Sequence, residues 1–188
     1  MRDKMNQLRI VVIGMPGAGK TTLARRLAAD LALPHLELDA VHWGPDWSPA
    51  PKAAMEHHLG QMAGMPCWVA DGNYFAEARP TLWRRATHLI WLDFPRRVVM
   101  PRVIARIIGR LAGRQVMWNG NREQWRHLLD PGHPIRYAWR MLHPRRAAIE
   151  AALASGAWNH LAVIRLRRPA ELAPALAGLQ RSLTPPPP

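Results

Sequence analysis

The chain has 188 residues, of which 48% are hydrophobic, and its formal net charge is +13. This length is typical of one domain with one sizeable core, and no apolar run approaches the ~20 residues that a membrane span needs. The single cysteine, Cys67, excludes an internal disulfide and favours a cytoplasmic location. Only 3 of the 26 basic residues are lysines, so arginine, which binds oxyanions in bidentate geometry, carries most of the positive charge.

The first predicted elements are a buried strand over 8–13, a glycine-rich turn and a helix that begins at Lys20. The turn fits G-x-x-x-x-G-K-[ST] in full. Glycine lets backbone N–H groups point inward around a phosphate, and the following helix aims its positive dipole end at the same place. Lys20 would neutralise the β- and γ-phosphates, and the Thr21 hydroxyl would ligate Mg²⁺. We therefore expect a triphosphate site made by Gly14, Pro16, Gly17, Ala18, Gly19, Lys20, Thr21 and Thr22.

Beyond this turn, short apolar strands alternate with helices. Strands are predicted over 35–39, 66–70, 87–92 and 160–166, and helices over 20–31, 52–64, 76–85, 98–111, 135–154 and 169–183. Such alternation indicates a parallel sheet that is covered on both faces. Ligands of such sheets bind beyond the carboxyl ends of the strands. Asp39, Asp71 and Asp93 all fall at predicted strand ends, on the same edge as the glycine-rich turn.

These three acids have different predicted roles. Asp71 follows an apolar run and is typical of the acid that holds a Mg²⁺-bound water across from Thr21; the alternative is a capping or turn role. Asp39 would accept a proton from a substrate hydroxyl or bind that substrate. Asp93 precedes Phe94-Pro95, which favours a helix cap.

An arginine stripe leads into an irregular segment that contains glycine. Arg102, Arg106 and Arg110 recur at i, i+4 spacing on the helix over 98–111. The stripe is either a solvated basic face or the border of a lid that closes over polyphosphate. If the stripe borders a lid, Arg106 and Arg110 are the candidates to contact the polyphosphate. Arg136 and Arg140, across the lid, are the next candidates.

Four segments together resemble a family. Gly14 to Thr21, 38–43, 68–74 and 90–95 come in the order seen in adenylate-kinase-like P-loop proteins. More narrowly, the chain is similar to small bacterial proteins labelled "DNA topology modulation protein" or "adenylate kinase-like ATPase". The resemblance implies an α/β three-layer sandwich with a five-stranded parallel sheet in the order 2-3-1-4-5. It also implies ATP and Mg²⁺ as cofactors, with the adenine near the lid arginines and Arg167.

The same resemblance implies one domain over 1–183, with an acceptor-binding insert at about 40–65, a lid at about 111–134 and a disordered tail at 184–188. Two departures from adenylate kinases concern the acceptor. Asp71-Gly72-Asn73-Tyr74-Phe75 lacks the arginine that grips AMP, and the insert contains no arginine. Asp39 with His42 and Trp43 fits a hydroxyl-bearing acceptor, as in shikimate- or gluconate-kinase-like proteins. The candidate substrate-binding residues are Asp39, His42, Trp43, Asp71, Asn73 and Arg136.

We therefore expect a cytoplasmic ATP-dependent phosphotransferase that acts on a nucleotide or a small hydroxyl-bearing metabolite. The candidate catalytic residues are Lys20, Asp39, Arg106 and Arg110, and the candidate Mg²⁺ residues are Thr21 and Asp71. Two alternatives stay open: a nucleotide-dependent DNA-binding regulator, and an ATPase whose only acceptor is water. The basic surface is compatible with non-specific nucleic-acid binding. We expect no membrane partner, and the sequence leaves a monomer and a dimer equally open.

Overall fold

The computed structural model describes residues 7–113, 115–130 and 132–183, so the tail at 184–188 lies outside the described residues. Its five strands are β1 (Arg9–Gly14), β2 (His35–Glu37), β3 (Trp68–Asp71), β4 (His88–Leu92) and β5 (Ala162–Leu166). Its α-helices are α2 (Lys20–Asp30), α3 (Leu38–His42), α4 (Lys52–Gly64), α5 (Phe75–Ala78), α6 (Arg96–Ala112), α7 (Pro134–Ala154) and α8 (Leu172–Leu183). Shorter turns of helix are η1 (Pro45–Trp47), η2 (Arg79–Trp83), η3 (Trp118–Gly120), η4 (Trp125–Leu129) and η5 (Pro169–Glu171). No helix among the described residues is both long and apolar enough to cross a bilayer.

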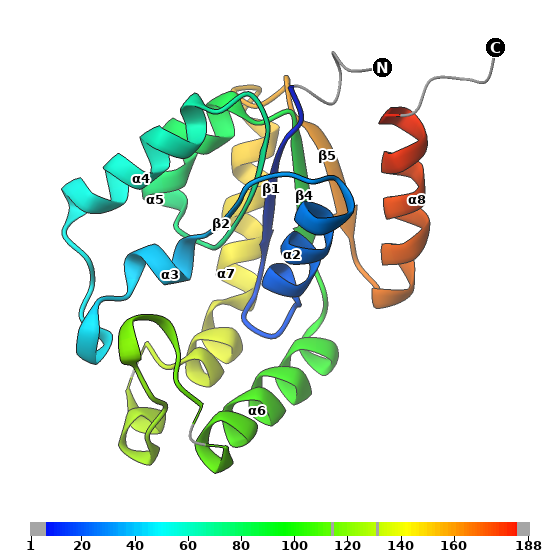
Figure 1. The fold of residues 1–188 in the computed structure, drawn as a ribbon. Coiled ribbons are helices and arrows are strands. Elements are labelled where there is room, and N and C mark those ends of the chain that lie inside the picture. Colours follow the sequence, from blue (N-terminus) through cyan, green and yellow to red (C-terminus); the bar gives the residue numbers. More distant parts are fainter. Residues whose placement is uncertain (1–6, 114, 131, 184–188) are drawn as a thin grey trace.

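The five strands form one parallel sheet in the order β2-β3-β1-β4-β5, which confirms the predicted order (Figure 1). β1 is central, and Gly14 at its end pairs with Leu92 of β4. On the other side, Glu37 of β2 pairs with Asp71 of β3. Because all strands run in one direction, their carboxyl ends meet at a single edge, where the loop after β1 also begins.

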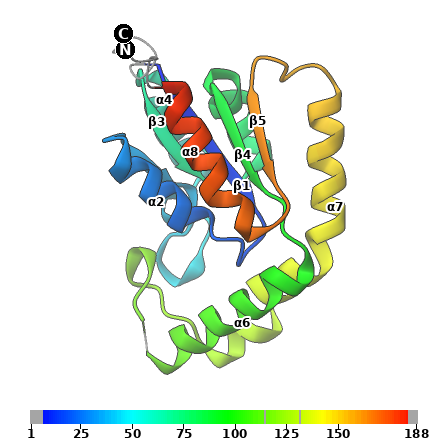
Figure 2. The same cartoon turned by 90° about the vertical axis from the view of Figure 1, so that its right-hand side faces the viewer.

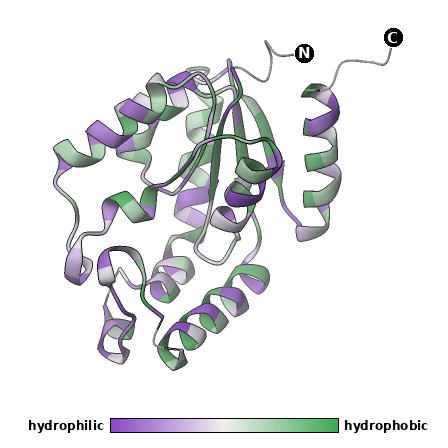
Figure 3. Cartoon of the chain, viewed as in Figure 1, coloured by the Kyte–Doolittle hydropathy of each residue, from purple (hydrophilic) through white to green (hydrophobic). Residues whose placement is uncertain are grey.

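Helices cover both faces of the sheet, as the alternating sequence predicts (Figures 1 and 2). One core is built from β1 with α2, α6, α8 and the first half of α7. The other core contains α4, α5, η2 and the second half of α7. Apolar residues concentrate on the strands, whereas the helices combine apolar and polar residues (Figure 3). α7 therefore contributes buried residues to both cores.

The second strand is shorter than predicted. It ends at Glu37, and the chain turns into α3 from Leu38, so Asp39 lies in the first turn of a helix and not at a strand end. Leu38 is 1% exposed and packs so closely on Gly72 that a Cβ there would lie 2.6 Å from the Leu38 Cβ. An acid in the first turn also suits the helix dipole. The sequence pattern could not reveal this boundary, because a buried leucine at position 38 is compatible with the end of a strand and with the start of a helix.

Candidate active site

The glycine-rich loop (14–21) joins β1 to α2 through backbone conformations that glycine adopts most easily. Gly17 has a φ of 84° and Gly19 a φ of 96°, both in the left-handed region. A Cβ on Gly17 would also lie 2.5 Å from the carbonyl oxygen of Val99. Gly19 is the N-cap of α2 and provides no side-chain cap. The N–H groups in the first turn of α2 therefore stay available to an anion in the loop.

Lys20 folds back over this loop. Its Nζ donates to the carbonyl oxygen of Met15 at 3.5 Å. Burial lowers the pKa of Lys20, while the negative charges of Asp39 and Asp71 oppose that shift. The charges of both predicted acids, Asp39 and Asp71, therefore act on the Lys20 ammonium.

The Asp71 carboxylate is held on both of its oxygens. The Thr21 hydroxyl donates to Oδ2 at 2.7 Å, and the Nε2 of His35 lies 2.7 Å from Oδ1. Asp71 is 2% exposed, so these two groups supply the hydrogen bonds that water cannot. The sequence predicted the pair of Thr21 and Asp71 but missed His35, since that contact depends on the register of β2 beside β3.

Asp39 is bound by an aromatic residue from the segment after β3. The Tyr74 hydroxyl donates to Asp39 Oδ1 at 2.8 Å, and burial raises the pKa of Tyr74. His42 lies against the same ring, with centroids 4.4 Å apart, and against Trp43 at 4.6 Å. Burial lowers the pKa of His42, which favours its neutral form. The predicted residues Asp39, His42 and Trp43 thus form one cluster, to which the structure adds Tyr74.

The three arginines of the α6 stripe lie in different surroundings. Arg102 is exposed and lies over the Phe94 ring at 5.9 Å. Arg106 is exposed as well, and Arg110 is half-buried. Partial desolvation of the two guanidinium groups lowers the pKa values of Arg106 and Arg110, whereas the charges of Asp39 and Glu123 raise both. The two residues chosen from the sequence are therefore within the electrostatic reach of Asp39.

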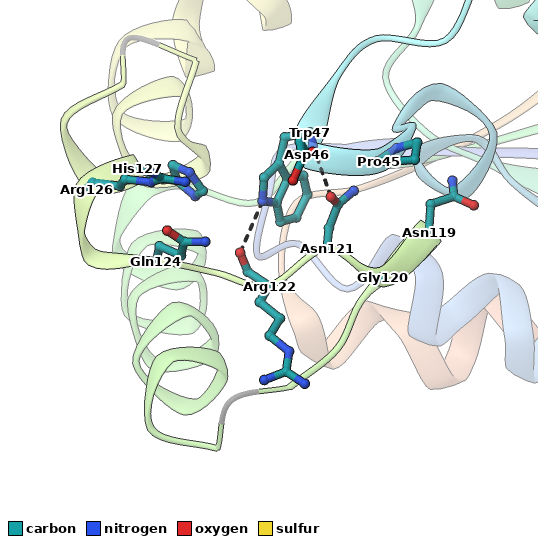
Figure 4. Close-up of a pocket in the computed structure, with 10 residues that line it drawn as sticks. All are labelled: Pro45, Asp46, Trp47, Asn119, Gly120, Asn121, Arg122, Gln124, Arg126 and His127. Carbon is teal, nitrogen blue, oxygen red and sulfur yellow. Dashed lines mark hydrogen bonds between the residues drawn. The ribbon is translucent and has the colours of Figure 1, made fainter.

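Two loops far apart in the sequence are hydrogen-bonded to each other beside this cluster (Figure 4). We name residues 43–49 the insert loop and 116–122 the lid loop; each is closed by an antiparallel bridge between its ends. Asn121 accepts from the backbone N–H of Trp47 at 3.0 Å and donates to the Gly44 carbonyl oxygen at 2.8 Å. The Asn119 side chain donates to the carbonyl oxygen of Trp43, and Trp47 Nε1 donates to the Arg122 carbonyl oxygen at 3.2 Å.

Aromatic rings continue the contact between the two loops. Trp47 lies edge-on to Trp43 at 5.9 Å and to Trp118 at 6.3 Å, and the Arg110 guanidinium lies 6.0 Å from the Trp118 ring. The hollow on the outer side of this contact has a volume of about 210 Å³ and is lined mainly by polar residues (Figure 4). The sequence pattern indicates only that the segment with these asparagines is irregular and does not predict their contacts with the insert loop.

The remaining predicted residues come from several elements. The N–H of Gly14 donates to Asn73 Oδ1 at 3.4 Å. Ala18 is buried, Pro16 is half-buried and Thr22 is exposed. Arg167 follows the last residue of β5, and its backbone N–H donates to Glu171 at 2.7 Å. Arg136 is exposed in the first turn of α7, and Arg140 is exposed one turn later.

The predicted role of Asp93 is wrong. The N-cap of α6 is Pro95, and no side chain caps that helix. Asp93 is instead 7% exposed and forms ion pairs with Arg146 of α7 at 2.7 Å and with Arg165 of β5 at 2.6 Å. These partners come from 53 and 72 residues further along the chain, so no local pattern could reveal them.

Comparison with known proteins gives the fold. No protein-family profile and no curated protein sequence matches the chain. Among solved structures, shikimate kinase from Acinetobacter baumannii in complex with shikimate has a TM-score of 0.56 at 18% identity, covering 96% of this chain and 97% of that one. Shikimate kinase from Aquifex aeolicus has a TM-score of 0.54 at 15% identity, covering 94% and 98%. A gluconokinase from Sinorhizobium meliloti has a TM-score of 0.49 at 18% identity, covering 93% of each chain.

The chain therefore has the fold of P-loop kinases. In this chain the strand order is β2-β3-β1-β4-β5, and the glycine-rich loop follows β1. The likeness is one of fold and gives no support to the narrower label of DNA topology modulation.

Proposed function

We propose that this protein is an ATP-dependent kinase that transfers the γ-phosphate to a hydroxyl group of a small molecule. The observation that carries the proposal is the geometry around the glycine-rich loop: Lys20 folds over it, and Thr21 at its end binds Asp71 at 2.7 Å. Phosphoryl transfer needs positive charge around the transferring group and an acceptor that is held in line with it. Lys20, Arg106 and Arg110 would supply the charge, and Asp39 would orient the acceptor hydroxyl or take its proton.

The residues present fit a magnesium ion. Mg²⁺ prefers oxygen ligands and usually retains several waters, so it needs few protein groups. Thr21 and Asp71 offer a hydroxyl and a carboxylate 2.7 Å apart beside the glycine-rich loop. Within the described residues no cluster of three or more His, Cys, Asp or Glu side chains could form an all-protein metal cage, which such a site does not require. When bound, Mg²⁺ would neutralise charge on the phosphates.

The remaining roles would belong to the segments around the site. We propose that 1–183 form one kinase domain in which 40–65 bind the acceptor and 111–134 act as the lid. His42, Trp43, Asn73 and Arg136 would contact the acceptor, and Arg167 would lie near the adenine. Support comes from the insert and lid loops, which contact each other beside Asp39 through hydrogen bonds.

The test is transfer of labelled γ-phosphate from ATP to a panel of nucleotides, sugars, polyols and hydroxy acids. Lys20→Met removes the cation at the phosphates, and we expect transfer to fall by about 10²-fold or more. Arg26→Met is the control for loss of a cation, because the Arg26 side chain is 65% exposed and its ion pair with Asp30 lies on the surface of α2. Transfer by Arg26→Met should equal that of the wild type.

The same panel separates the two rival functions. An ATPase would release phosphate at the same rate with and without every acceptor. A DNA-binding regulator would show background transfer across the panel, bind duplex DNA tightly at 150 mM salt and retain that binding in Asp39→Ala. Either result would overturn the kinase proposal. Weak DNA binding that falls steeply with salt would reflect only the net charge of +13.

A further inference from the structure

The Tyr74 hydroxyl occupies one oxygen of the Asp39 carboxylate. It donates to Asp39 Oδ1 at 2.8 Å, and both residues are half-buried. Among the residues that the structure describes, no group forms a hydrogen bond with the other oxygen, Oδ2. A carboxylate that is held on one oxygen by a fixed neighbour keeps its second oxygen in one direction. The contact therefore leaves a single oriented oxygen on the acid that we expect to meet the acceptor hydroxyl.

The tyrosine is a fixed neighbour because several groups hold it. Its ring lies against His42, with centroids 4.4 Å apart, and its carbonyl oxygen accepts from the Ala78 N–H at 2.7 Å. Phe75, the next residue in the chain, is buried in the core beneath α4 and η2. Both the ring and the backbone of Tyr74 are therefore anchored, and the position of its hydroxyl follows from theirs.

Three consecutive residues after β3 connect the glycine-rich loop with α3. Gly72 packs so closely on Leu38, the first residue of α3, that a Cβ there would lie 2.6 Å from the Leu38 Cβ. Asn73 accepts from the Gly14 N–H at 3.4 Å, and Tyr74 then contacts the second residue of α3. The same short segment therefore touches the start of the phosphate loop and the candidate acceptor acid, so it relates the position of one to that of the other.

The tyrosine hydroxyl is a lasting donor. Burial raises the pKa of Tyr74, and the negative charge of Asp39 raises it further. The hydroxyl therefore keeps its proton across the neutral range of pH and cannot take a proton from an acceptor. In this pair only the carboxylate can accept a hydrogen bond or a proton from a substrate hydroxyl.

We propose that Tyr74 is a positioning residue for phosphoryl transfer: its hydroxyl fixes the Asp39 carboxylate so that Oδ2 meets the acceptor hydroxyl. This inference rests on the proposed kinase function and adds a residue to it. In this role Tyr74 touches neither the acceptor nor the phosphates. The rival role is that of a plug, in which the tyrosine hydroxyl takes the place of the acceptor hydroxyl at Asp39 and must leave before the acceptor binds.

The kinetic test is Tyr74→Phe in the full-length protein, which removes the hydroxyl and keeps the ring against His42. Labelled ATP is the donor, and AMP, glucose, glycerol and gluconate are the acceptors, one from each class of the panel. We expect kcat to fall by about tenfold or more while the KM for ATP changes by less than about threefold, because a misdirected carboxylate slows transfer and leaves the phosphate site intact.

Tyr137→Phe is the matched control. It removes the other tyrosine hydroxyl of the chain, which accepts from Arg145 Nε at 2.6 Å, so each variant loses one hydrogen bond. Urea midpoints of the two variants should therefore be similar, whereas kcat should fall only in Tyr74→Phe. A loss of kcat in Tyr74→Phe at equal stability separates a positioning role from a loss of fold.

A double-mutant cycle asks whether Tyr74 acts through Asp39. In an Asp39→Ala background Tyr74→Phe should lower kcat by less than about threefold, since the group that it positions is already gone. A further tenfold loss in that background would overturn the positioning role. Unchanged kcat in Tyr74→Phe alone would overturn it too, and a lower KM for the acceptor with kcat unchanged or raised would identify the plug instead. Absence of transfer by the wild type to all four acceptors and to the wider panel would overturn the kinase function itself, and the role of Tyr74 with it.

Discussion

The carboxylate of Asp71 shows how single side chains prepare this site. Its two oxygens contact Thr21 and His35, each at 2.7 Å, and only 2% of the residue is exposed. A carboxylate held on both sides keeps one orientation, so the oxygen beside Thr21 stays directed at the place where Mg²⁺ would bind. We therefore regard His35 as a residue that positions Asp71 and does not itself touch the substrate.

Replacement of His35 tests this positioning. His35→Leu leaves one oxygen of a buried carboxylate without a partner, and we expect it to lower the free energy of unfolding by about 1–3 kcal/mol. It should also raise the Mg²⁺ concentration needed for half-maximal activity. Urea denaturation measures the first effect and a Mg²⁺ titration the second.

A conservative variant provides the control for His35. His35→Gln keeps an N–H donor on a side chain of similar reach, so it should restore most of the stability and of the Mg²⁺ response. An equal Mg²⁺ requirement in the Leu variant and the wild type would show that His35 only fills space.

At the scale of elements, the insert loop and the lid loop are joined by a small set of polar contacts. Asn121 alone makes two of them, to Trp47 and to Gly44. Asp39 lies in α3, directly before the insert loop, while Arg110 lies in α6, directly before the lid loop. The contact between the two loops therefore connects the segment that follows Asp39 with the segment that follows Arg110.

Loss of the Asn121 side chain should weaken this contact. Asn121→Leu removes two hydrogen bonds worth about 1 kcal/mol each, so we expect kcat/KM to fall by roughly tenfold or more. Amide hydrogen exchange at Trp47 should speed up as well, because its N–H loses the acceptor. Gln124→Leu is the matched control, since Gln124 is exposed in the same segment. Unchanged exchange at Trp47 in Asn121→Leu would contradict the role of this contact.

For the whole molecule, Asp93 connects parts of the fold that are far apart in the sequence. It follows β4, and its ion pairs reach Arg146 in α7 and Arg165 in β5. Arg165 also lies over the Trp91 ring at 4.1 Å. The network therefore fixes α7, with Arg145 and Arg146, against the sheet edge where the site is built.

Asp93→Asn should destabilise the entire chain. The change leaves two arginines near the sheet without their shared anion, and we expect the free energy of unfolding to fall by about 3–5 kcal/mol, the range for breaking a buried ion pair. Asp30→Asn is the matched control: Asp30 pairs with Arg26 on the surface of α2, and its loss should cost about 0.5 kcal/mol or less. Guanidinium denaturation of both variants tests the difference, and equal midpoints would contradict it.

Sequence patterns predicted those parts of the site whose residues are close together in the chain. The glycine-rich loop with Lys20 and Thr21 is continuous in the chain, so its strand, turn and helix could be predicted together. Asp71 could be placed because an apolar run leads directly to it. The roles of Asp93 and His35 could not be predicted, since their partners depend on how strands and helices pack. Arg79 and Arg145 are 66 positions apart, yet both guanidinium groups lie against the ring of Phe75.

The sequence alone determined the alternation of strands and helices, the loop after the first strand and the types of residue available at the sheet edge, because each depends on neighbours within a few positions. The tertiary structure alone decided which of those residues meet: His35 with Asp71, Tyr74 with Asp39, the insert loop with the lid loop, and Arg79 with Arg145 around Phe75. The physical reason is that a parallel sheet gathers the ends of strands that are distant in the chain, and local periodicity contains no information about which partners those ends receive.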